Sequence, residues 1–262
     1  MSTFAMHVAK TGLNSQQIKM QVIANNLANV NTTGFKADRA NFESLLYQIL
    51  RGAGDNTSEN TSLTSGLSVG TGTRLLNTSK LHTQGSLINT GNSLDISIEG
   101  DGFFQVLLPD GRVAYTRSGA FSRDAEGTVT TASGYPIQPE ITIPPEALSI
   151  NISSDGIVSV QVPGAVDAEE VGQITLADFP NRQGLQPNGE SMLLETPASG
   201  APIIAAPFEE GMGRTVQGSL ESSNVNVVQE LVDMIETQRA YEVSSKTITS
   251  VDEMMRYLAQ NV

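Results

Sequence analysis

The stretch FAMHVAKTGLNSQQIKMQVIANNLANV, at Phe4–Val30, decides the fold because its apolar residues repeat every seven positions. Met6, Leu13, Met20 and Leu27 share one position of the repeat, and Ala9, Ile23 and Val30 share the position three residues later. This is the spacing of a coiled-coil seam, interrupted at Gln16. The spacing predicts a long helix with a narrow apolar stripe, ending near the asparagines that precede Gly34.

A second stretch of the same kind, NVVQELVDMIETQRAYEVSSKTITSVDEMMRYLAQ, lies at the other end of the chain, at Asn226–Gln260. Its apolar residues recur at steps of mostly three, four or seven and are Val227, Leu231, Met234, Tyr241, Ile248, Val251, Met255 and Leu258. Asn226 followed by Gln229 has the pattern of a capping box. The sequence therefore predicts a helix at each end of the chain.

Neither stripe can be covered by the helix that carries it. Ordering a helix of this length costs conformational entropy that the burial of one narrow stripe does not offset. We therefore expect both helices to be poorly ordered until each is covered by the other or by a neighbouring molecule.

Short strands are predicted for the middle of the chain. Apolar residues alternate at 94–98, 148–152 and 158–162, which gives each segment one apolar and one polar face. Turn sequences separate such segments: Pro109–Gly111 joins FFQVLL to RVAYTR, and Asp155–Gly156 joins SINIS to IVSVQV. The predicted fold class is α+β, mostly β, with discontinuous terminal helices forming a coiled-coil stem and a central antiparallel β domain as an excursion.

Three domains are expected on this basis. Residues 1–33 with 223–262 form the helical domain, 34–74 an extended connector with an insert, and 75–222 the β domain. Within the connector, residues 51–73 are rich in glycine and small polar residues, a composition typical of a loop or linker. The alternative is an insert that becomes ordered only against neighbouring subunits.

Composition excludes several classes of function. The 262 residues carry a formal net charge of -13, which argues against a surface for nucleic acid or for an anionic membrane. The sequence has no cysteine, so disulfides and thiolate metal sites are excluded. No apolar run approaches the roughly 20 residues that span a bilayer, and Met1–Leu13 lacks the features of a signal peptide.

The search for a catalytic site gives a negative prediction. Gly66–Gly70 matches the G-x-S-x-G pattern, but that motif requires a strand before it and a helix after it, whereas polar linker sequence surrounds it here. The two histidines, His7 and His82, are isolated and cannot form a common zinc site without carboxylates from elsewhere. We expect no enzyme activity, no cofactor and no metal site.

Specific residues at both ends carry a resemblance to a known family. AKTGLNSQQIKMQVIANNLANVNTTGFK, at Ala9–Lys36, resembles the signature of the axial proteins of the bacterial flagellum, whose rod and hook subunits share an asparagine-rich A-N-N-x-A-N-x-x-T-x-G-[FY]-K core. The stretch Ser223–Met255 resembles the partner signature of that family. The signature positions in this chain are Asn25, Asn26, Asn29, Gly34, Phe35, Lys36, Asn224, Arg239, Ala240 and Tyr241.

Within the family, the chain is most similar to the distal rod subunits. FESLLYQ at 42–48, LHTQGSL at 81–87 and GDGFFQVLLPDGRVAYTRSGAFSRDAEG at 100–127 carry that similarity, which covers most of the chain. The chain departs from the family at His7, where an apolar residue is common, and residues 183–208 are less characteristic.

The resemblance implies a structural subunit of the distal rod that self-assembles into a helical tube and transmits torque from motor to hook. It implies export through the flagellar type III apparatus without a cleaved signal peptide, and a location in the basal body from the periplasm to the outer membrane. The implied partners are other copies, proximal rod proteins, the hook protein or hook junction, and the P-ring and L-ring bushing proteins, with no nucleic acid and no membrane insertion. The expected assembly interface consists of the helical stripes: Met6, Leu13, Met20, Ile23, Leu27 and Val30, with the eight apolar residues of the second helix.

Two alternatives remain from the sequence. Within the family, the chain could be a proximal rod or hook subunit. From a different class, the β-rich middle is compatible with a surface adhesin or a glycan-processing domain, which would be a soluble monomer that binds or cleaves glycans.

Overall fold

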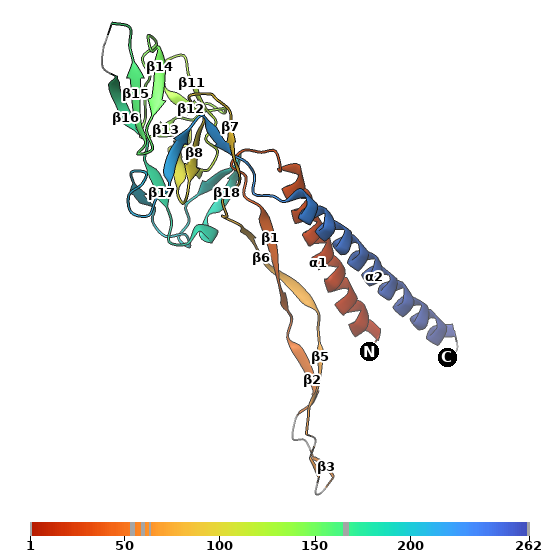
Figure 1. Ribbon diagram of the computed structural model, residues 1–262. Coiled ribbons are helices and arrows are strands. Elements are labelled where there is room, and N and C mark those ends of the chain that lie inside the picture. Colours follow the sequence, from red (N-terminus) through yellow and green to blue (C-terminus); the bar gives the residue numbers. More distant parts are fainter. Residues whose placement is uncertain (1, 53–55, 59–60, 63, 165–167, 261–262) are drawn as a thin grey trace. The chain divides into compact units, whose positions relative to one another are not determined.

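The computed structural model describes residues 2–52, 56–58, 61–62, 64–164 and 168–260 (Figure 1). These residues belong to two compact units. The first unit is formed from segments 1–27, 38–79 and 226–262, and the second from 28–37 and 80–225. The second unit thus takes in residues 28–37, which sequence analysis divided between the helical domain and the connector.

The first unit contains both terminal helices that the sequence predicts, α1 (Ser2–Ala28) and α2 (Val227–Gln260). Asn226 caps α2, since its Oδ1 accepts hydrogen bonds from the backbone N–H groups of Val228 at 3.1 Å and Gln229 at 3.3 Å. The Gln229 side chain donates to Asp233 Oδ1 instead of returning to Asn226. The predicted cap therefore forms, whereas its reciprocal half does not.

Helices α1 and α2 run antiparallel within the first unit (Figure 1). Asn26 Nδ2 donates to Glu230 Oε1 at 3.0 Å, and a Cβ placed on Gly12 would lie 4.0 Å from Ser244 Oγ. Gly12 does not interrupt α1. It lies where the two helices face each other, and a Cβ at this position would make an ordinary van der Waals contact with α2.

Residues 38–80 form a succession of two-stranded ribbons. β1 (Asp38–Ser44) pairs with β6 (Thr73–Lys80), β2 (Tyr47–Arg51) with β5 (Leu67–Gly70), and β3 (Asn56–Ser58) with β4 (Thr61–Ser62). The interpretation of 51–73 as a loop is therefore wrong for its described strand residues. Glycine and small polar residues pair here through their backbone, which composition does not reveal. Parts of that stretch, at 53–55, 59–60 and 63, lie outside the described residues.

The same ribbon excludes a nucleophile elbow at Ser68. Ser68 lies within β5, and strand β6 follows it instead of a helix. The match to G-x-S-x-G is therefore a coincidence of composition, as the sequence analysis expected.

The second unit is built around a seven-stranded sheet with the order β18-β19-β10-β9-β17-β20, in which β13 also pairs with β9. Its strands are β9 (Phe103–Leu107), β10 (Val113–Thr116), β13 (Ile137–Gln138), β17 (Leu176–Asp178), β18 (Gln186–Gly189), β19 (Met192–Leu194) and β20 (Ile203–Ala205). The predicted hairpin at Pro109–Gly111 is β9–β10, with Val113 opposite Leu107.

Smaller sheets complete the second unit. They pair β11 (Phe121–Arg123) with β12 (Val129–Thr131), β8 (Ile96–Glu99) with β21 (Arg214–Gln217), and β7 (Leu87–Asn89) with β22 (Ser219–Glu221). A further sheet has the order β14 (Ser149–Ile152), β15 (Ile157–Gln161) and β16 (Glu169–Gln173), and one turn of 3-10 helix, η1, spans Arg182–Gly184. The predicted hairpin at Asp155–Gly156 is β14–β15, with Ile150 opposite Val160.

The core of the second unit lies between these sheets. Its largest cluster contains Ile96, Ile98, Phe104, Phe121, Val129, Ile137, Ile141, Ile143, Ile152, Val158, Val160, Ile174, Leu176 and Met212. Phe104 is fully buried and packs edge-to-face on Phe121, with 5.2 Å between ring centroids. Leu148, predicted on the apolar face, is instead exposed, because it precedes the first residue of β14. Among the described helices, none has the length and apolar content required to cross a membrane.

Candidate assembly interface

The signature residue Asn26 joins three elements of the first unit. Its side chain is 2% exposed. Oδ1 accepts from the Asp38 backbone N–H at 2.8 Å, and Nδ2 donates to the Asp38 carbonyl at 2.9 Å as well as to Glu230. Only a side-chain amide can accept from and donate to the same backbone in this way. Asn26 therefore holds the end of α1 to the start of β1 and to the first turn of α2.

The signature glycine is required by its surroundings. Gly34 has φ +67°, and a Cβ at this position would lie 2.4 Å from the backbone nitrogen of Ser118. Its N–H donates to the Glu221 carbonyl at 2.9 Å. Because the backbone of one segment passes directly over another, no larger residue fits here.

A buried carboxylate, Glu221, receives the signature lysine. Lys36 Nζ lies 2.6 Å from Glu221 Oε1 and also donates to the Thr83 carbonyl at 2.8 Å. The Gly85 N–H donates to the same Oε1 at 2.9 Å, and Arg117 Nη1 lies 3.7 Å from Oε2. The side chains of all three charged residues are at most 4% exposed. We call Lys36, Arg117 and Glu221 the buried ion cluster.

Burial and the charge of Glu221 shift the pKa values of the two cations in opposite directions. Burial is the largest cause that lowers the pKa of Lys36, and the hydrogen bond to Glu221 opposes it. Burial likewise lowers the pKa of Arg117, against the attraction of Glu221. Arg117 also donates to the Gly100 carbonyl at 2.6 Å and lies over the Phe103 ring. Each cation is thus held by a carboxylate and by backbone carbonyls.

The signature residue Asn224 also connects the segment after α1 to the segment before α2. Its Oδ1 accepts from the Ala37 N–H at 2.8 Å, and its Nδ2 donates to the carbonyls of Leu81 at 2.8 Å and Thr83 at 3.0 Å. Lys36 and Asn224 therefore close the second unit by joining the segment after α1 to the segment before α2. Sequence reasoning did not find Glu221 or Arg117. Glu221 lies 185 residues from Lys36, so no local sequence pattern pointed to the pair.

The two histidines have different surroundings. His82 packs edge-on against Phe103, with 5.7 Å between ring centroids, and burial followed by the charge of Lys36 lowers its pKa to about 4. His7 is exposed on α1. Across the described residues, no group of three or more acidic or histidine side chains could hold a metal ion.

The remaining signature residues have less distinctive surroundings. Asn25 Nδ2 lies 3.5 Å from Asp38 Oδ2, and Asn29 Oδ1 accepts from Thr32 Oγ1 at 3.2 Å. Phe35 lies under Lys80 Nζ, 5.2 Å from the ring centroid. On α2, Arg239 is exposed, and Ala240 and Tyr241 are half-buried.

The predicted stripe residues are only partly covered within one chain. On α1, Ile23 is buried and Met6, Leu13, Met20 and Leu27 are half-buried. Val30, predicted on the same stripe, is half-buried but lies in the turn beyond the end of α1 at Ala28. On α2, Val251 is buried and Met234, Tyr241, Ile248 and Met255 are half-buried, while Val227 and Leu231 are exposed; the side chain of Leu258 lies outside the described residues.

Small and polar residues occupy the covered line of α2. Glu230, Thr237, Ser244 and Val251 follow one another at seven-residue steps and are buried or half-buried. Thr237 is 1% exposed and donates to the Asp233 carbonyl at 2.6 Å. Leu231, one position after Glu230, is 44% exposed. The described chain thus leaves large apolar side chains of α2 uncovered.

These uncovered residues gather in two places. The first three turns of α2 expose Val228, Leu231, Val232 and Ile235. The ribbon around β2 exposes Leu46, Tyr47, Ile49 and Leu50, with Leu46 at 89%. Contiguous exposed apolar residues of this kind mark contact surfaces for other proteins.

Comparisons with known proteins identify the family of the chain. Three family profiles match the chain: "Flagella basal body rod protein" at 6–36, "Flagellar hook protein FlgE/F/G D1 domain" at 97–160, and "Flagellar basal body rod FlgEFG protein C-terminal" at 216–261. The chain is 52% identical to the flagellar basal-body rod protein FlgG of Buchnera aphidicola subsp. Schizaphis graminum, over 98% of both chains. It is 43% identical to FlgG of Caulobacter vibrioides over 98% of both, and 31% identical to FlgF of the same organism over 96% and 95%.

The buried ion cluster predicts a large effect on stability when its one carboxylate is replaced by an amide. Glu221→Gln leaves Lys36 and Arg117 buried without their carboxylate and should lower the free energy of unfolding by about 3–5 kcal/mol. Glu99→Gln is the matched control, because the Glu99–Arg214 pair at 2.7 Å is about half exposed and should contribute about 0–1 kcal/mol. Urea unfolding of the full chain measures both, and equal small losses would contradict the assigned role of Glu221.

Proposed function

We propose that this chain, which belongs to the family of flagellar basal-body rod proteins named FlgG, is a structural subunit of the distal rod. It assembles with copies of itself into the helical tube that transmits torque from motor to hook. The proposal rests on the apolar surface of α2 and of the ribbon around β2, which is exposed in a single chain. A subunit that polymerises through these regions covers that surface in the assembly.

The beginning of α2 supports this proposal most directly. Val228, Leu231, Val232 and Ile235 are spaced at i, i+3, i+4 and i+7, so they share one exposed face of the helix, while Glu230 lies on the opposite side and faces Asn26. Because α1 covers the side of Glu230, the apolar face on the other side of α2 requires a second partner. In the rod, α1 supplies one partner and the helices of neighbouring subunits supply the others, which together form the coiled-coil stem.

The stripe residues predicted from the sequence keep their role in this proposal. Half-buried residues such as Leu13 and Met234 pack within one subunit and along its neighbours, whereas exposed Leu231 packs only between subunits. Gly12 and Ser244 lie opposite each other where α1 and α2 meet within one subunit. This division gives one helix pair both an intrasubunit and an intersubunit face.

The ribbon at 38–80 is proposed to stiffen the rod. An isolated two-stranded ribbon is marginally stable in water, and this one displays apolar side chains such as Leu46 and Ile49. Packing of the ribbon on adjacent subunits would order it and restrict bending between them.

The remaining assignments follow from the family resemblance. The subunit is exported unfolded by the type III apparatus and adds at the tip of the growing rod, which crosses the periplasm to the outer membrane. Its neighbours are proximal rod proteins, the hook or hook junction, and the P-ring and L-ring proteins around it. The subunit has no catalytic role and requires no cofactor.

The higher identity to FlgG than to FlgF in one organism favours the distal rod over another rod position. Family membership gives no support to an adhesin or glycan-processing domain.

Leu231→Asp tests the intersubunit role of α2. Since Leu231 is 44% exposed in the single chain, the substitution should change the free energy of unfolding of the purified subunit by no more than about 0.5 kcal/mol. Rod assembly and motility should be lost, because a charge enters the contact between subunits. Thr247→Asp, at an exposed polar position of the same helix that lies off the face of Leu231, is the control and should swim normally. Normal basal bodies from Leu231→Asp would refute the intersubunit seam.

Deletion of residues 48–65 tests the stiffening role of the ribbon. The variant retains β1, β6 and both signature segments, so export and assembly should continue, while isolated basal bodies should show curved rods by electron microscopy. Replacement of 48–65 by a Gly/Ser segment of equal length separates strand pairing from chain length and should also give curved rods. Straight rods in both variants would reject the stiffening role.

A further inference from the structure

His82 lies in the middle of the short segment that connects the two ends of the second unit. The carbonyl of Leu81 accepts from Asn224 Nδ2 at 2.8 Å. The carbonyl of Thr83 accepts from Asn224 Nδ2 at 3.0 Å and from Lys36 Nζ at 2.8 Å. Lys36 follows α1 and Asn224 precedes α2, so the backbone on both sides of His82 holds both ends of the unit. We call residues 81–83 the closing segment.

The imidazole ring of His82 has surroundings that suit its neutral form. Its two nitrogens are buried, and neither has a hydrogen-bond partner within the described residues. The ring packs edge-on against Phe103, with 5.7 Å between the ring centroids. A protonated ring carries two N–H donors and a charge, and burial of a charge without a partner is costly. The closing segment is therefore built around an uncharged histidine.

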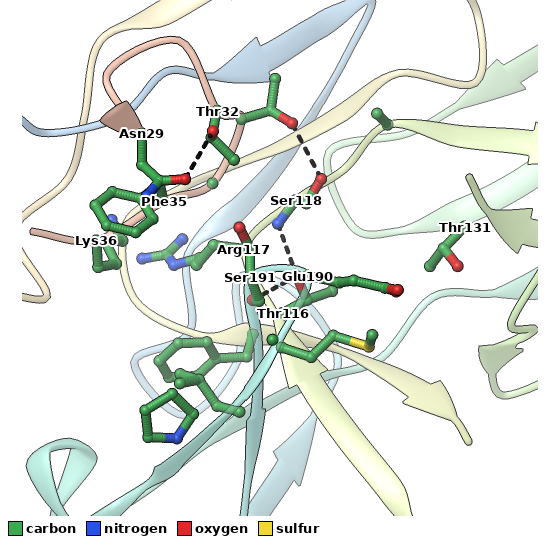
Figure 2. Close-up of a pocket in the computed structure, with 18 of the residues that line it drawn as sticks. Asn29, Thr32, Phe35, Lys36, Thr116, Arg117, Ser118, Thr131, Glu190 and Ser191 are labelled. Atoms are coloured by element: carbon green, nitrogen blue, oxygen red, sulfur yellow. Dashed lines mark hydrogen bonds between the residues drawn. The ribbon is translucent and has the colours of Figure 1, made fainter. Parts of the chain in front are cut away.

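Cations from three other parts of the second unit oppose a positive charge on this ring. Lys36 comes from the segment after α1, Arg117 from the residue after β10, and Arg182 from η1. Figure 2 shows Lys36 and Arg117 side by side. Lys80 lines the same surface cavity as His82. Burial and then the charge of Lys36 lower the pKa of His82 to about 4, and the backbone of Arg182 only partly opposes them.

The carboxylates in this region are already bound to the same cations. Glu221 belongs to the buried ion cluster. Asp178 accepts two hydrogen bonds from Arg182, both at 2.6 Å, and Asp101 accepts a third at 2.6 Å. A protonated His82 would either remain unpaired or take a carboxylate from the cation that now holds it. Either result weakens the contacts that close the second unit.

We propose that His82 is an acid-sensitive switch of the second unit: the neutral ring allows the closing segment to hold both ends of the unit, and a proton taken from solvent by the ring releases them. The consequence for assembly rests on the proposed function. A subunit that reaches an acidic surrounding would close its second unit less readily and would join the rod less readily.

The direction of the pH effect follows from the two states of the chain. The ring loses its proton more easily in the folded chain, with a pKa of about 4, than in the unfolded chain, where the ordinary value is 6.5. Folding therefore releases a proton within this range. The stability that depends on the neutral ring is complete above about pH 6.5, is lost progressively as the pH falls, and changes no further below about pH 4.

Unfolding of the full chain by urea at a series of pH values tests the switch. His82→Phe keeps a flat ring beside Phe103 and cannot take a proton. Between pH 6.5 and pH 4, the unfolding equilibrium constant of the wild-type chain should rise roughly a hundredfold more than that of His82→Phe. The sequence has only one other histidine, His7, which is exposed on α1. His7→Phe is therefore the matched control and should follow the wild type.

A measurement on the wild-type chain does not depend on the folding of a variant. The imidazole signals of His82 in NMR spectra report protonation of the ring, and hydrogen exchange of the Leu81 amide, which donates to the Ala37 carbonyl at 2.8 Å, reports the closing segment. Both should change together as the pH falls.

Two results would overturn the switch. One is the same pH dependence in the wild type and in His82→Phe, and the other is a ring that takes up its proton while the Leu81 amide stays protected. Neither result would affect the proposed function. A wild-type chain that shows the expected pH dependence but does not enter basal bodies would support the switch and overturn the proposed function alone.

Discussion

The apolar side chains of the terminal helices outnumber the contacts that one chain provides for them, and the arrangement of the first unit follows from this constraint. Where α1 meets α2, the contacts involve Gly12, Asn26, Glu230 and Ser244. These residues are small or polar, and a hydrogen bond from Asn26 to Glu230 joins the two helices. The large residues Leu231, Val232 and Ile235 remain exposed. Burial of these residues, which is the larger driving force, is then available for assembly.

A different interaction organises the second unit. The Glu221 carboxylate is fully buried between Lys36 and Arg117, and the backbone of the same residue accepts from Gly34. A buried ion pair contributes little net stability compared with apolar packing, but it tolerates few alternative arrangements. It fixes the segment after α1 against the segment before α2. The second unit can fold in this way only when the segment after α1 and the segment before α2 are both present.

The sequence predicted elements whose signal is local. The seven-residue repeat predicted α1 and α2, and the turn at Pro109–Gly111 predicted the β9–β10 hairpin. Three features were not predicted from the sequence because their cause is not local. Lys36 was recognisable as a signature residue, but its partner Glu221 lies 185 residues away. The covered line of α2 passes through Glu230 and Thr237 and not through Leu231, and the hydrogen bond from Asn26 to Glu230 turns this side of α2 toward α1. The ribbon at 38–80 is held by backbone pairing, for which glycine- and serine-rich composition gives no signal.

Hydrogen exchange on the purified subunit and on assembled rods tests most directly whether assembly covers what the single chain exposes. Backbone amides at 228–235 and at 46–51 should exchange rapidly in the subunit and become protected in the rod, while amides of β9 and β10 should be protected in both. Equal protection of 228–235 before and after assembly would contradict the account, because the terminal helices would then be complete without neighbouring subunits.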